Sequence, residues 1–72
     1  MVNVNKLKGK FVENGFSVED VAKKIGVDRA TLYRKINSQG GNISICEADK
    51  IVNVLGLSVD EATAIFFSQL VS

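Results

Sequence analysis

Side chains suited to hydrogen bonding with bases and phosphates are concentrated near the middle of the chain. Arginine carries a planar fork of donors that fits guanine O6 and N7, and a good pair of this kind is worth about 1–3 kcal/mol of discrimination. Small or hydroxyl-bearing neighbours could contact a thymine methyl group or a phosphate oxygen. These residue types indicate binding rather than bond-breaking chemistry. The candidate contact residues here are Arg29, Ala30, Thr31, Tyr33, Arg34, Lys35, Asn37, Ser38 and Gln39.

Groups that perform catalysis or hold metals are scarce in this sequence. The chain has no histidine and a single cysteine, Cys46, so it lacks the parts of a histidine-based triad or a His/Cys metal site. We expect Cys46 to be a small, buried, apolar residue. Three serines, Ser17, Ser44 and Ser58, are explained as helix caps. We therefore expect no enzyme, cofactor, metal or small-molecule substrate.

Length and composition predict one globular domain over residues 1–72, with 46% hydrophobic and 24% charged residues. The N-terminus lacks the apolar run of a signal peptide, and no segment approaches the roughly 20 apolar residues of a membrane span. A single cysteine cannot form an internal disulfide. The expected location is the reducing cytoplasm.

Charge is distributed unevenly along the chain, although the net charge is only +1. Residues 1–46 hold eight basic and four acidic residues, and residues 47–72 hold one basic and four acidic residues. The positive part contains the candidate contact residues. This asymmetry suits a polyanionic partner on one face, although two ordinary solvated faces would give the same count.

Two short helices are predicted, at 18–25 and at 29–37 or 38. The contact residues fall on the second of these helices and at the start of the loop that follows it. Ser17 is a good N-cap for the first helix, and Gly26 ends it because glycine enters a left-handed turn without steric cost. Ala22 is small enough for two helices to cross closely. In the second helix, Leu32 and Ile36 face inward. The outward arc is then Ala30, Arg34 and Asn37, flanked by Thr31 and Tyr33.

Three further helices complete the predicted fold, which is all-α with no strand. The first runs from 4 or 5 to 13, and the last two run over 45–55 and from 59 to 67 or 70. The patterns Ser44-x-x-Glu47 and Ser58-x-x-Glu61 are capping boxes that start the last two. The residues expected to face inward from these two helices are Ala48, Ile51, Val52, Leu55, Val59, Ala62, Ile65 and Phe66.

The stretch from Val18 to Ile36 resembles the DNA-binding unit of small Cro-and-repressor (XRE-type) regulators of phages and their hosts. The resemblance rests on Ala22, Gly26 and Val27, followed by the segment 28–37 with the sequence DRATLYRKIN. It implies a compact five-helix domain with a helix-turn-helix at helices two and three. It also implies that the helix at 29–38 enters the major groove of double-stranded operator DNA. The protein would then regulate transcription by occluding a promoter.

Two positions depart from the pattern of this family. Val18 stands where a phosphate-clamping Gln is common, so Ser17 or a backbone amide would have to contact the phosphate. Lys35 occupies a position that is often apolar, and we expect Ile36 to pack in its place while Lys35 flanks the groove. The loop at 38–42 is expected to run beside the sugar-phosphate backbone, or to be a plain linker.

The C-terminal end is more apolar than one buried stripe requires. We expect Phe67, Leu70 and Val71 to form a homodimer surface, at least on DNA; alternatively, the tail folds back and buries them in the monomer. The alternative function is a protein-binding module, such as an antirepressor, that grips a partner repressor through this apolar end.

Overall fold

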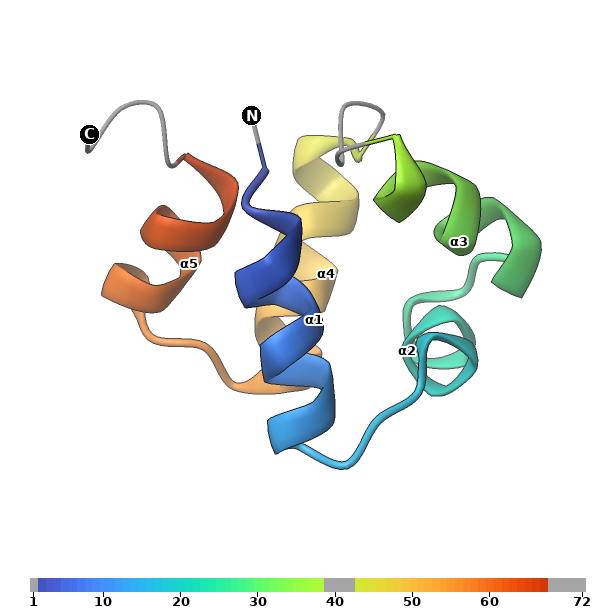
Figure 1. The fold of residues 1–72 in the computed structure, drawn as a ribbon, viewed down its shortest axis with the longest axis horizontal. Coiled ribbons are helices and arrows are strands. Elements are labelled where there is room, and N and C mark those ends of the chain that lie inside the picture. Colours follow the sequence, from blue (N-terminus) through green and yellow to red (C-terminus); the bar gives the residue numbers. More distant parts are fainter. Residues whose placement is uncertain (1, 39–42, 68–72) are drawn as a thin grey trace.

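Five helices make up the part of the chain that the computed structural model describes, residues 2–38 and 43–67. In Figure 1, α5 lies on one side of α1 and α4, and α2 and α3 lie on the other. α2 packs against α3 and α4, and α1 packs against α5. The described residues contain no strand, so the predicted all-α fold is confirmed. The helices are α1 (Val4–Glu13), α2 (Val18–Ile25), α3 (Arg29–Asn37), α4 (Ile45–Leu55) and α5 (Val59–Phe66).

A short polar side chain starts each helix. Asn3 and Asp28 cap α1 and α3 by accepting hydrogen bonds from backbone amides of the first turn. Ser17, Ser44 and Ser58 cap α2, α4 and α5, and in each case an acidic residue three positions later accepts a hydrogen bond from the serine amide. The two predicted capping boxes are therefore confirmed. Ser17 and Asp20 form a third capping box through reciprocal hydrogen bonds. For this helix the sequence analysis predicted only the Ser17 cap.

Glycines end α2 and α4 in the left-handed conformation. Gly26 has φ of 80° and Gly56 has φ of 64°, values that an L side chain adopts only with strain. The Gly26 and Val27 amides both donate to the Ala22 carbonyl oxygen, at 2.9 and 3.0 Å. Two donors on one carbonyl turn the chain sharply between α2 and α3.

The core draws at least two buried side chains from every helix. Its most completely buried members, such as Leu7 and Ile51, contribute about 1.5–3 kcal/mol each relative to exposure. The Asn3 amide also donates to the Ile65 carbonyl at 2.6 Å, which fastens the start of α1 to the end of α5. The core residues are Leu7, Phe11, Val21, Ala22, Ile25, Leu32, Ile36, Ile51, Leu55, Ile65 and Phe66.

Two predictions of burial are wrong. Cys46 is exposed, because at 100° per residue it lies about 140–180° around α4 from the buried Ile51 and Leu55. Val59 is 82% exposed although it shares the angular position of Phe66. It is the first residue of α5 and projects beyond the end of the core. The predicted inward residues Ala48, Val52 and Ala62 are only partly buried.

Candidate nucleic-acid interface

The exposed face of α3 carries the side chains predicted to face outward. Ala30, Arg34 and Asn37 are all exposed, and they follow one another at three- and four-residue spacing along the helix. Tyr33 beside them is 46% exposed, and Thr31 at the edge is half-buried. On the opposite face, Leu32 and Ile36 are 2% exposed and hold α3 against the core. The helix thus presents a polar stripe whose orientation is fixed by its apolar side.

Arg29 lies at the start of α3, away from this stripe. Its Nη1 is 3.3 Å from Oε2 of Glu19, the second residue of α2, and the two side chains are 63% and 46% exposed. The other oxygen of Glu19 lies 3.6 Å from the Lys23 ammonium. Glu19 therefore joins α2 to the start of α3, a contact that the sequence analysis did not predict.

Lys35 is directed to α4 rather than to solvent. Its Nζ lies 2.7 Å from both carboxylate oxygens of Glu47, and the two side chains are only 22% and 18% exposed. Hydrogen bonds from Lys35 and from the Ser44 amide lower the pKa of Glu47. Lys35 therefore joins α3 to α4, and its predicted contact with DNA stays a prediction.

Ser17 and Ser38 differ in the hydrogen bonds that they leave available. Ser17 Oγ accepts from the Asp20 amide and keeps its own hydroxyl proton for another acceptor. The Ser17 amide donates a hydrogen bond to the Asp20 carboxylate, and this bond lowers the pKa of Asp20. Ser38 Oγ donates its only proton to the Lys35 carbonyl at 2.8 Å. Gln39, the remaining predicted contact residue, lies outside the described residues.

Ion pairs, within and between helices, divide the cations into two groups. Lys10 contacts Glu61 of α5 and, at 3.3 Å, Glu13; with the pairs of Lys35, Lys23 and Arg29, this accounts for four basic side chains. No local pattern predicts the Lys10–Glu61 contact, because the residues are 51 positions apart. Within residues 2–38 and 43–67, five cations have no carboxylate oxygen within 4.0 Å of a side-chain nitrogen: Lys6, Lys8, Lys24, Arg34 and Lys50.

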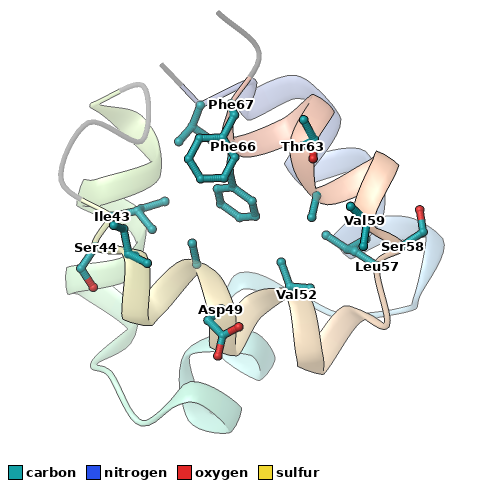
Figure 2. Close-up of a pocket in the computed structure, with 14 residues that line it drawn as sticks. Ile43, Ser44, Asp49, Val52, Leu57, Ser58, Val59, Thr63, Phe66 and Phe67 are labelled. Carbon is teal, nitrogen blue, oxygen red and sulfur yellow. The ribbon is translucent and has the colours of Figure 1, made fainter. Parts of the chain in front are cut away.

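A hollow between α4 and α5 is lined mostly by apolar side chains. Its volume is about 340 Å³, and Figure 2 shows Phe66 and Phe67 at one side of it with Val52 and Leu57 toward the other. Phe67 is 48% exposed. Leu70 and Val71, predicted to belong to the same surface, lie outside the described residues.

Two further features are absent from the part of the chain that the structure describes. None of its helices has the length and apolar character needed to cross a membrane. It also holds no group of three His, Cys, Asp or Glu side chains placed to bind a metal ion.

Two capped helices joined by a glycine turn, the second with a polar outer face, define a helix-turn-helix DNA-binding domain. The family model described as Helix-turn-helix matches residues 7–61 of the chain. The chain therefore belongs to this family of DNA-binding regulators, the XRE-type family that the sequence was found to resemble. Comparison with curated proteins and with solved structures found no match.

Proposed function

We propose that the protein is a sequence-specific transcriptional repressor of the small phage or prophage type, similar in size to Cro. The observation that carries the proposal is the stripe of Ala30, Arg34 and Asn37 on α3, held outward by buried Leu32 and Ile36. The major groove of B-DNA is wide enough to admit an α-helix, and side chains of its first turn and middle then reach base edges. Binding would occlude a promoter.

The proposed contacts divide into base readers and phosphate contacts. Arg34 has no carboxylate partner among the described residues and is free to form the bidentate contact with guanine. Ala30, Thr31 and Tyr33 are proposed to contact thymine methyl groups or phosphate. The hydroxyl of Ser17 and the amides that open α2 are proposed to contact the backbone, as is the segment at 38–39.

We propose that the protein binds its operator as a homodimer. The support is the apolar hollow between α4 and α5, with the half-exposed Phe67 at its rim. Such a patch on a small domain marks an interaction surface. Two recognition helices on one face of the duplex should then lie about 34 Å apart, one turn of B-DNA.

Selection of bound duplexes from a random pool, followed by anisotropy titration at two salt concentrations, tests this function. We expect enrichment of a short palindrome and an affinity that falls steeply as salt rises. A single enriched half-site would contradict the dimer but not the DNA binding. Absence of binding at low salt would contradict the DNA-binding function.

The same apolar hollow supports a second candidate function, a module that binds a partner repressor. Under this alternative, Phe67→Ser abolishes partner binding while Arg29→Ala and Arg34→Ala have no effect. Under the operator-binding proposal the two arginine variants lose site-specific affinity. Comparing these variants in one binding assay therefore separates the two functions.

A further inference from the structure

The direction of the Arg29 side chain is not set by the register of α3. At 100° per residue, Arg29 lies about 60° from Leu32 and about 20° from Ile36, so by angle it belongs to the buried face. Its side chain is nevertheless 63% exposed, because it is the first residue of the helix and extends beyond the core. A long side chain in this position samples many rotamers unless a partner restrains it.

Glu19 is that partner, and it is itself restrained. One of its oxygens faces Arg29 at 3.3 Å and the other faces Lys23 at 3.6 Å. Lys23 lies one turn further along α2, so the contact with Lys23 restricts the carboxylate from its own helix. The three side chains line a hollow of about 390 Å³ between the two helices of the helix-turn-helix. They form a bridge from α2 to the start of α3.

We infer that Glu19 is a specificity-determining residue, which positions Arg29 to read a base at the first turn of α3. This inference rests on the proposed function. The guanidinium has five N–H donors, and the single hydrogen bond from Nη1 to Glu19 leaves others for guanine O6 and N7. A restrained arginine loses less rotamer freedom when it binds its base. A carboxylate here also repels phosphate, which weakens binding to every sequence.

Because Glu19 both positions Arg29 and repels phosphate, its replacement should affect binding to the operator and binding to random duplex differently. Glu19→Gln is expected to bind random duplex as well as or better than the wild type, because a negative charge is lost. Its preference for the selected operator over random duplex is expected to fall about two- to fivefold, the range for one exposed ion pair. Glu19→Asp, which keeps the charge but shortens the side chain, is expected to lose a similar share of this preference.

The matched control is Glu13→Gln, because Glu13 also contacts a lysine and its replacement changes the net charge equally. It should leave the ratio of the two dissociation constants unchanged. In an Arg29→Ala background, Glu19→Gln should no longer alter this ratio, since a residue that acts through Arg29 has nothing left to position. Circular dichroism melting checks that each variant is folded.

Three results would overturn the inference while leaving the proposed function standing. The first is an equal loss of preference in Glu19→Gln and Glu13→Gln. The second is a loss that persists when Arg29 is already alanine, and the third is an Arg29→Ala variant with unchanged preference. If the wild type selects no sequence at all, the proposed function fails with it.

Discussion

Arg34 and Lys35 are adjacent cations on α3, but they have different surroundings. Arg34 is exposed and meets no carboxylate of the described residues, whereas Lys35 is largely covered and bound by both oxygens of Glu47. One residue step rotates the side chain by about 100° around the helix, enough to move it from the outer stripe to the junction with α4. Positive charge alone therefore does not identify a DNA contact in this segment.

Replacing Arg34 with alanine tests the outer stripe directly. We expect a loss of about 1–3 kcal/mol on the selected site and a much smaller loss on random duplex, because a bidentate contact to guanine exists only on the correct sequence. Anisotropy titration of both duplexes at one salt concentration measures the difference. Lys50→Ala removes another cation that has no carboxylate partner among the described residues. It is the control and should change both affinities little. Equal losses on the two duplexes would reject Arg34 as a base reader.

Gly26 sets the turn through its backbone conformation rather than through lack of space. A Cβ atom there would meet no atom within 4 Å, but φ is +80°. Gly26→Ala is therefore expected to cost about 1–2 kcal/mol of unfolding free energy, the strain of an L residue in this region.

Gly9→Ala is the matched control for this strain. Gly9 lies inside α1, also with open space around its Cβ position and without a positive φ. Alanine there should stabilise the protein by about 1 kcal/mol, because glycine is a poor helix former. Urea unfolding should give opposite signs for the two variants. The same sign for both would show that backbone conformation at Gly26 is not the determining factor.

At the scale of elements, the boundaries of the helices follow from caps that can be read locally. A serine with an acidic residue three positions later marks the start of α2 and of α4, and a glycine marks the end of each. The predicted bounds of these two helices are those observed. Burial was predicted wrongly at two residues in the first turns of α4 and α5, for different reasons. Cys46 lies on the side of α4 opposite its buried residues. Val59 shares the angular position of Phe66 but is exposed, because the packed core does not extend to the first residue of α5. The inter-helix pairs of Lys10 and Lys35 could not be predicted from local spacing. They depend on the packing of helices distant in sequence.

Glu61 joins two elements, because it closes the capping box of α5 and contacts Lys10 of α1. The hydrogen bonds from Lys10 and from the Ser58 amide lower its pKa from 4.5 to about 2. The folded pKa lies below the unfolded value, so this contribution to stability is complete above about pH 4.5 and is lost as pH falls toward 2. The same contact raises the pKa of Lys10. The contribution of the Lys10 ammonium to stability is therefore lost only as pH rises into the alkaline range.

Glu61→Gln is therefore expected to melt at a lower temperature than the wild type at neutral pH. The difference should shrink as pH falls and be nearly gone at about pH 2, where the wild-type carboxylate is also being protonated. Thermal melting followed by circular dichroism over this pH range measures both trends. Asp60→Asn removes a neighbouring carboxylate that forms no ion pair among the described residues, and it should lose less stability at neutral pH. A pH-independent deficit in Glu61→Gln would contradict the assignment.

At the scale of the whole molecule, the ion pairs reduce the charge asymmetry that the sequence indicates. Two of the four acidic residues after position 46, Glu47 and Glu61, are bound to lysines of the basic part. The acidic part is therefore less charged on its surface than its sequence indicates. Two copies of the α4–α5 face can approach with little mutual repulsion, which favours the proposed homodimer over a partner chosen by charge.

Phe67→Ser tests this face. Burying the half-exposed ring is worth about 1 kcal/mol per protomer, so the dimer dissociation constant should rise about ten- to thirtyfold. Sedimentation equilibrium measures this change, and affinity for a two-half-site operator should fall while affinity for one half-site stays constant. Val12→Ser is the control, because Val12 is an apolar residue of α1 that is 78% exposed and does not line the hollow. If both variants weaken association equally, or if neither does, the dimer does not form through Phe67.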